Sequence, residues 1–131
     1  MSDVTPAELS SLADRMTGII EGYLNELGKL GVPATVDLDG GYYIGYGKVE
    51  GHYRIWILEP SPFSGDVLKM FPNLENLLDP SKKDLSRTSR DKRAKYLVHL
   101  PQLLKKQQSA ANELRDAMQT ALDLIEKLEV Q

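Results

Sequence analysis

Apolar residues near the start of the chain recur at steps of three and four, the spacing of one face of an α-helix. The stripe consists of Leu9, Leu12, Met16, Ile19, Tyr23, Leu27 and Leu30. Thr5 precedes Pro6 and lies three residues before Glu8, which is typical of a helix start. Gly31 follows the last apolar residue and favours termination. The pattern predicts a helix within residues 1–31.

The polar and apolar residues that follow have the short period of β-strands. Residues 34–38, 42–48 and 53–58 are rich in β-branched and aromatic side chains, and glycine-containing turns separate them. Because such short connections join neighbouring antiparallel strands, we expect a three-stranded antiparallel meander over residues 34–59.

Residues 60–84 show no sustained period and contain four of the seven prolines. Residues 71–78 could form a short helical turn. The segment is predicted to be a long excursion, either an ordered wrap or a lid or partner-binding loop, because connections of this length are uncommon in compact domains.

The remaining part of the chain, residues 85–129, has a helical pattern in two pieces. A helix should begin near Ser86 or Ser89 and run to about His99, with Pro101 kinking or restarting it. A long helix is expected over about 102–129. Its stripe comprises Leu104, Gln107, Ala111, Leu114, Met118, Ala121, Ile125 and Leu128, widened by Leu103, Ala110, Ala117 and Leu124.

The predicted fold class is therefore α+β. It consists of an N-terminal helix, a three-stranded antiparallel meander, a long loop, and two C-terminal helices packed on the sheet or in a dimer seam. The width of the last helix's stripe favours a bundle or a homodimer through that helix. At 131 residues, with 41% hydrophobic and 27% charged residues, the chain is expected to form one globular domain.

Several classes of protein are made less probable by the composition. The chain has no cysteine, so disulfide frameworks, thiolate nucleophiles and cysteine-based zinc sites are excluded and a reducing compartment is the simplest setting. The N-terminus lacks the basic and apolar regions of a signal peptide, and no apolar run has the length of a membrane span. We expect a cytoplasmic protein without membrane contact.

The formal net charge of −3 hides an uneven distribution. Residues 1–80 carry a net charge of −7, residues 81–106 carry +7, and residues 107–131 carry −3. The basic segment is either a solvated helix surface or a site for anionic partners.

Helical geometry over the basic segment separates its arginines from its lysines. At about 100° per residue, Arg93 falls within the apolar stripe and Arg90 at its edge, whereas Lys92 and Lys95 fall on the opposite, solvent-facing side. An inward arginine needs a partner because an unpaired buried charge is costly. That partner is either an internal carboxylate, for example from the acidic N-terminal helix, or an external anion.

If the partner is external, the start of this helix is the predicted anion site. Arg87, Arg90 and Arg93 would hold a phosphate, together with Ser89 and the backbone N–H groups of the first turn.

The predicted hairpin offers a second set of candidate ligand residues. Alternation places Tyr43 on the same face as Gly45 and Gly47, and two glycines there would let a ligand or a helix approach the backbone closely. On these strands, aromatic and cationic side chains that could stack on and neutralise a nucleotide are Tyr43, Tyr46, Lys48 and Arg54. The glycine spacing is not that of a P-loop.

The sequence contains few residues in arrangements typical of a catalytic site. The two histidines, His52 and His99, belong to different predicted elements, and no serine lies in a nucleophile-elbow sequence. We expect a non-enzymatic protein with no cofactor and no metal.

The leading hypothesis is a protein that holds or sequesters a small anionic ligand of the nucleotide type, such as a phage-encoded sponge. The alternative is a protein–protein interaction module, such as an adaptor, an immunity protein or a secretion chaperone, with no small ligand. Nucleic-acid binding is the weakest hypothesis, because a pI of about 5.4 opposes the basic surface that phosphate backbones require.

Overall fold

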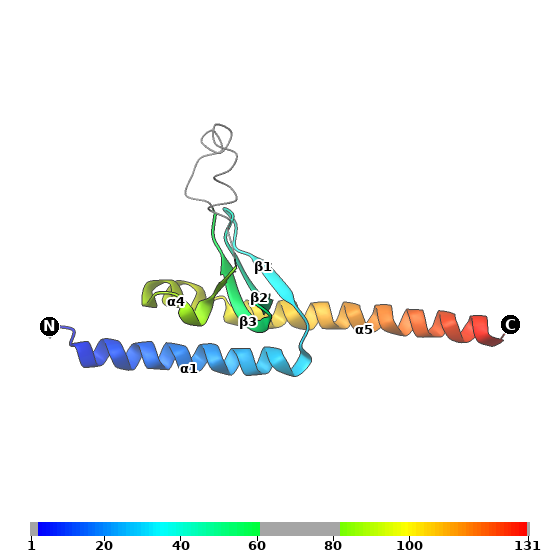
Figure 1. Ribbon diagram of the computed structural model, residues 1–131, viewed down its shortest axis with the longest axis horizontal. Helices are drawn as coiled ribbons and strands as arrows, with labels where there is room; N and C mark the ends of the chain where they lie inside the picture. The colour runs from blue at the N-terminus through cyan, green and yellow to red at the C-terminus, as the bar shows by residue number, and fades with distance from the viewer. Residues whose placement is uncertain (1–2, 61–81, 131) are drawn as a thin grey trace, which may run out of the picture.

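The computed structural model describes residues 3–60 and 82–130 and has an α+β architecture, which confirms the predicted fold class (Figure 1). The elements, in chain order, are α1 (Pro6–Leu30), β1 (Ala34–Asp37), β2 (Tyr43–Val49), β3 (His52–Leu58), β4 (Lys83–Asp84), the 3-10 helix η1 (Leu85–Arg87), α4 (Arg90–Leu97) and α5 (Leu100–Val130). The predictions for residues 71–78, and for a lid or binding loop over residues 61–81, fall outside the described residues.

Helix α1 begins and ends as the sequence predicts. The Thr5 hydroxyl accepts a hydrogen bond of 3.1 Å from the backbone N–H of Glu8, and Pro6 occupies the first turn. At the other end Gly31 has a left-handed conformation, with φ at 65°, and its N–H donates to the carbonyl of Leu27. The sequence therefore determines the limits of this helix locally.

The sheet is antiparallel throughout, with the strand order β1-β2-β3-β4. Its first three strands form the predicted meander, and Ile44 lies opposite Ile57 in the register of β2 and β3. Strand β4 was not predicted: Lys83 and Asp84 were assigned to the excursion, but they pair with the end of β3. Two polar residues carry no strand signal of their own, so this pairing depends on tertiary context.

The core lies between one face of the sheet and the helices α1, α4 and α5. Strand residues Val36, Ile44, Ile55 and Ile57 point into it and alternate with residues on the opposite face. The helices contribute Ile20, Leu27, Tyr96, Leu100 and Leu103. In Figure 1, α1 and α5 run in the same direction beneath the sheet, and the C-terminal half of α5 extends well past the end of α1.

The C-terminal region forms two helices, as expected. Ser89 is the N-cap of α4, and α5 begins at Leu100, so Pro101 lies in its first turn. The inward position predicted for Arg93 is confirmed, because its side chain is half-buried against α1. The outward position predicted for the lysines is confirmed for Lys95, which is exposed, whereas Lys92 is half-buried. Lys92 pairs with Glu59, and Lys95 lies 4.2 Å from the ring centre of Tyr42.

These lysine contacts have a simple geometric cause. Helix α4 has neighbours on more than one side, since it packs on α1 while its lysines reach Tyr42, just before β2, and Glu59, just after β3. A two-face division of the helical wheel therefore describes Arg93 and Lys95 but not Lys92. None of the described helices is long and apolar enough to cross a membrane.

Candidate functional site

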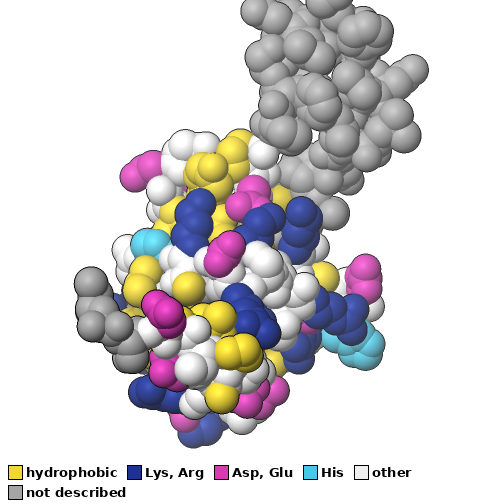
Figure 2. Space-filling view, turned by 90° about the vertical axis from the view of Figure 1, so that its left-hand side faces the viewer, with side chains coloured by type: hydrophobic (Ala, Val, Ile, Leu, Met, Phe, Trp, Pro, Cys, Tyr) yellow, Lys and Arg dark blue, Asp and Glu magenta, His cyan; other side chains and the backbone are white. Residues whose placement is uncertain are grey.

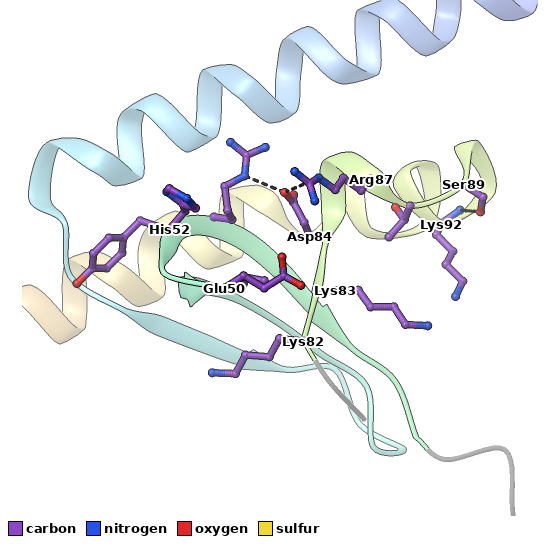
Figure 3. A pocket seen from close by; sticks show the side chains of 12 residues that line it. Glu50, His52, Lys82, Lys83, Asp84, Arg87, Ser89 and Lys92 are labelled. Carbon is purple, nitrogen blue, oxygen red and sulfur yellow. Dashed lines mark hydrogen bonds and ion pairs between the residues drawn. The ribbon is translucent and has the colours of Figure 1, made fainter. Parts of the chain in front are cut away.

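A groove of about 870 Å³ lies at the β4 edge of the sheet, where β3, β4, η1 and the start of α4 meet (Figure 3). Strand β4 pairs with β3 only at Trp56 and Ile57, so the first half of β3 is not covered by it. The groove is lined by Val49, Glu50, His52, Tyr53, Arg54, Lys82, Lys83, Asp84, Arg87, Thr88, Ser89 and Lys92. We call this set the edge groove.

Five lining residues are lysine or arginine, whereas only Glu50 and Asp84 are acidic. One ion pair forms a fixed part of the wall. Arg54 Nε donates to Asp84 Oδ2 over 2.9 Å, and Arg54 Nη2 donates to the hydroxyl of Ser86 over 2.8 Å. The Asp84 side chain is only 10% exposed and that of Arg54 is 33% exposed, so the pair is partly shielded from solvent and holds β3 and η1 together.

Asp84 also shapes the backbone that follows it. Its Oδ1 accepts hydrogen bonds of 3.0 Å from both the backbone N–H and the hydroxyl of Ser86, which caps η1. Burial acts to raise the pKa of Asp84, but the hydrogen bonds from Arg54 and Ser86 outweigh it and hold the pKa below its ordinary value. The carboxylate is therefore charged at neutral pH and neutralises Arg54.

A second ion pair fixes α4 beside the end of β3. Lys92 Nζ lies 2.6 Å from Glu59 Oε1, and the Tyr96 hydroxyl donates to Glu59 Oε2 over 3.2 Å. The hydrogen bond from Lys92 lowers the pKa of Glu59. Burial, reinforced by the negative charge of Glu59, raises the pKa of Tyr96. Lys92 is therefore neutralised by a residue outside the groove wall.

Three cations of the edge groove have no carboxylate of their own: Lys82 and Lys83 form no ion pair among the described residues, and Arg87 shares Asp84 with Arg54. Arg87 Nε is 3.9 Å from Asp84 Oδ2, and its side chain is 81% exposed. Lys82 Nζ lies 4.6 Å from the ring centre of Trp56, and Lys83 forms no ion pair there. The Thr88 hydroxyl donates to the Leu85 carbonyl over 2.7 Å, but the Ser89 hydroxyl on the same wall has its proton free among the described residues, so the groove offers positive charge and a hydroxyl donor to an anion.

The structure divides the predicted arginines between three surroundings. Arg87 lines the edge groove, whereas Arg90 lines a different, apolar groove of about 430 Å³ between α1 and α4. Arg93 Nη1 donates to the Thr17 hydroxyl over 2.9 Å, and its buried Nε has no partner. Arg93 therefore contacts neither the predicted carboxylate nor the edge groove, and the three arginines do not form one phosphate grip.

The other predicted ligand residues are also separated. Arg54 and Ser89 line the edge groove, and Lys48 Nζ lies 5.8 Å from the ring centre of Tyr53, which also lines it. Tyr46 is only 4% exposed and belongs to the core, so it is not available for stacking on a ligand. Tyr43 is half-buried on β2 and does not line the groove.

The glycines of β2 accommodate a side chain of the sheet itself, which corrects the expectation of a ligand or a helix at this place. Trp56 lies opposite Gly45 in the register, and a Cβ atom on Gly45 would fall within 2.7 Å of Cη2 of the Trp56 ring. Gly47 lies beside the same ring, with Nε1 3.4 Å from an added Cβ. The space beside Gly45 and Gly47 is therefore occupied by the indole of Trp56.

Sequence reasoning did not select Lys82, Lys83 and Tyr53. The charge block over residues 81–106 contains both lysines, but their place beside the end of β3, with Lys83 opposite Ile57, follows from the pairing of β4 with β3, which the sequence pattern did not predict. Charge was thus the one signal that could have found them.

Among residues 3–60 and 82–130, no group of three histidine, aspartate or glutamate side chains is placed to hold a metal ion. His52 lines the edge groove, whereas His99 contacts Gln102 on α5. Comparison of the chain with protein-family models, with curated proteins and with solved structures gives no match.

Proposed function

We propose that the protein binds a small anionic ligand of the nucleotide type in the edge groove and does not act on it chemically. The observation that supports this proposal is the presence in one groove of Lys82 and Lys83, which form no ion pair among the described residues, and of Arg87, whose only ion pair there is a long one to an Asp84 that already neutralises Arg54. This excess of positive charge favours a multiply charged anion, because the carboxylates of the groove do not neutralise all of its cations.

Each wall of the groove has a part in this proposal. The exposed guanidinium of Arg87 can grip phosphate oxygens with two parallel N–H donors, and Lys83 adds a point charge. Ser89 supplies a hydroxyl donor beside them. Tyr53 is 44% exposed and offers a ring face to a base. The ion pair of Arg54 with Asp84 serves as a rigid wall, since its charges already satisfy each other.

The same proposal places the protein in the cytoplasm, where nucleotides are abundant, and gives it no cofactor. Binding without turnover would sequester the ligand, as a sponge does. The absence of cysteine fits a reducing compartment.

The alternative function is a protein–protein interaction module, and a second groove favours it. Between α1 and α4 lies a cavity of about 430 Å³ lined mainly by apolar side chains, and among them Leu9, Leu12 and Ile19 are about half exposed. Figure 2 views the molecule from the N-terminal end of α1 and shows hydrophobic side chains between charged ones on that face. Exposed apolar surface of this kind is typical of contact sites.

Native mass spectrometry of the purified protein, combined with thermal shift, tests the proposed function. The panel should contain nucleoside mono-, di- and triphosphates, cyclic nucleotides and pyrophosphate. We expect one compound to raise the melting temperature by several degrees and to appear as an added mass. Variants R87Q and K83Q should lose most of this shift, because each removes a groove cation.

The matched controls are K105Q and K106Q, which remove the same charge from exposed positions of α5 outside the groove. They should keep the full shift. Equal losses in both pairs would show that the shift comes from net charge and would contradict a site in the groove. Indifference to every compound would favour the interaction module.

A further inference from the structure

The C-terminal half of α5 has no described residue packed against it. Every residue from Asn112 to Val130 is exposed, whereas Leu100, Leu103 and Gln107 near the start of the helix are buried. Figure 1 shows this half extending alone beyond the sheet and beyond α1. Six large apolar side chains on it are between 48% and 58% exposed: Leu114, Met118, Leu122, Leu124, Ile125 and Leu128. An apolar stretch of this size on a projecting helix indicates a contact surface.

This exposed stripe continues the seam by which α5 packs on the body. Leu104 and Gln107 pack on the body, and the same alternation of four and three residues continues through the exposed half. Its later members are Leu114, Met118, Ala121, Ile125 and Leu128. Spacing of this kind forms two-helix seams, so the occupant of the stripe is a helix.

Two further apolar residues identify the centre of the contact. Leu122 and Leu124 flank the seam on opposite sides, at positions where coiled coils usually carry charges. They are symmetric about residue 123. In an antiparallel pair of α5 helices with a two-fold axis at residue 123, Leu122 meets Leu122 of the second copy on one side. Leu124 meets Leu124 of the second copy on the other. The arrangement buries both.

Charges favour the same arrangement. Arg115 and Glu129 lie seven residues before and after Leu122, and therefore in the same flanking row. About a two-fold axis at residue 123, Arg115 faces Glu129 of the second copy, and this ion pair forms twice. In a parallel pair with aligned ends, Arg115 would face Ala110 and Glu129 would face Leu124, so no ion pair would form.

The central layers also fit. Ala121 faces Ile125 of the second copy, so a small side chain meets a large one, and Met118 faces Leu128 of the second copy. Val130 of the second copy then lies opposite Asp116. The pairing therefore stays within the exposed half of α5 and does not reach the half-buried Ala111, where α5 meets the body. The seam spans residues 116–130, about 21 Å at 1.5 Å per residue, and its helix is already nucleated by the folded body.

We propose that the exposed half of α5 is a self-association surface. Two copies of the chain pair antiparallel through residues 116–130 about an axis at residue 123, and the two bodies lie at opposite ends of the seam. This inference is independent of the edge groove.

The full chain tests the proposal by sedimentation over a range of concentrations. We expect a dimer that dissociates on dilution, and we expect L122E to be monomeric at concentrations where the unchanged chain is dimeric, because two glutamates would face each other. Leu122 is 58% exposed in the single chain, so circular dichroism of L122E should show an unchanged fold. A monomer at every soluble concentration, or a dimer unaffected by L122E, would overturn the proposal.

Charge reversal tests the register. R115E and E129R should each weaken the dimer several-fold, and the double variant should restore it, because the reversed charges pair again. K127E and E126R change the charge equally on positions outside the seam and should leave the dimer unchanged. Failure of the double variant to recover would contradict the antiparallel register.

Crosslinking tests the direction, and the absence of cysteine makes it simple. L122C should crosslink to itself with a short bismaleimide, and K127C should not. Crosslinking of A121C without L122C would indicate a parallel pair and overturn the proposal. A dimer abolished by L12E in the groove between α1 and α4, without crosslinking of L122C, would show that the stripe occupies that groove instead.

Discussion

The side-chain amide of Gln107 closes the C-terminal end of α1 by donating a hydrogen bond of 2.7 Å to the carbonyl oxygen of Leu27. The same nitrogen donates to the carbonyl oxygen of Val32 over 3.0 Å. Helix ends leave carbonyls without intrahelical partners, and a buried carbonyl needs a donor. A completely buried glutamine of α5 supplies it and ties α1 to α5 at the turn into β1.

Replacement of this glutamine should be costly although leucine has a similar volume. Q107L leaves the Val32 carbonyl without its donor and removes one of two donors to the Leu27 carbonyl, and we expect a loss of about 1–3 kcal/mol in the free energy of unfolding. Urea denaturation measures it. The control Q108L removes an exposed glutamine that bonds only Asn112 and should change stability by less than about 0.5 kcal/mol. Equal effects would contradict the capping role.

Gln107 illustrates how far sequence pattern predicts this fold. The spacing placed it correctly on the inner face of the last helix, because three- and four-residue periodicity reports which side faces the body. The spacing does not indicate which residues form hydrogen bonds with Gln107. Leu27 and Val32 lie 80 and 75 residues earlier in the chain, and only the packing of α1 on α5 brings their carbonyls to Gln107.

The candidate site was less predictable than the helices for the same reason. Local sequence patterns predicted the ends of α1, the three-stranded meander and the break between α4 and α5. The edge groove depends on β4, a pair of polar residues that become a strand only beside Trp56 and Ile57. Arg93 faces inward, as predicted. The helical wheel does not indicate its partner, which is the Thr17 hydroxyl of α1 and not a carboxylate.

Arg93 should therefore affect stability and leave ligand binding in the edge groove unchanged. R93A removes a 2.9 Å hydrogen bond to the Thr17 hydroxyl and the packing of a half-buried side chain, and we expect a loss of about 1–2 kcal/mol in the free energy of unfolding. R90A at an exposed position should cost less than about 0.5 kcal/mol. Loss of the ligand-induced thermal shift in R93A, with unchanged stability, would place Arg93 in a binding site.

The ion pair of Asp84 with Arg54 should make stability depend on acidity. Because the folded-state pKa of Asp84 is lowered, its contribution is present above the unfolded-state pKa and is lost as the pH falls through the folded-state pKa, below about pH 4. D84N should lose about 1–3 kcal/mol at neutral pH and show a shallower decline below pH 4. Denaturation of both proteins at a series of pH values measures how steeply the free energy of unfolding falls with pH in each. D116N, at an exposed pair, is the control and should keep the slope of the unchanged chain. If the free energy of unfolding fell equally steeply with pH in D84N and in the unchanged chain, the pH dependence could not be assigned to Asp84.

Gly45 should tolerate no side chain, because the Trp56 indole occupies the space where a Cβ atom would lie. G45A forces either the ring or the strand to move, and we expect a loss of about 1–3 kcal/mol in the free energy of unfolding. Trp56 is the only tryptophan and is 4% exposed, so its fluorescence should report the displacement directly.

The control for this substitution lies in α1. An added Cβ at Gly22 meets nothing within 4 Å, and Gly22 is in the helix interior, so G22A should stabilise the protein by about 0.5–1 kcal/mol. The opposite signs separate a steric clash from a general response to alanine. A double-variant cycle with W56F then tests the contact itself, because residues in contact are not additive. If G45A costs as much in W56F as in the unchanged chain, the indole is not the obstacle, and the strand backbone alone requires glycine.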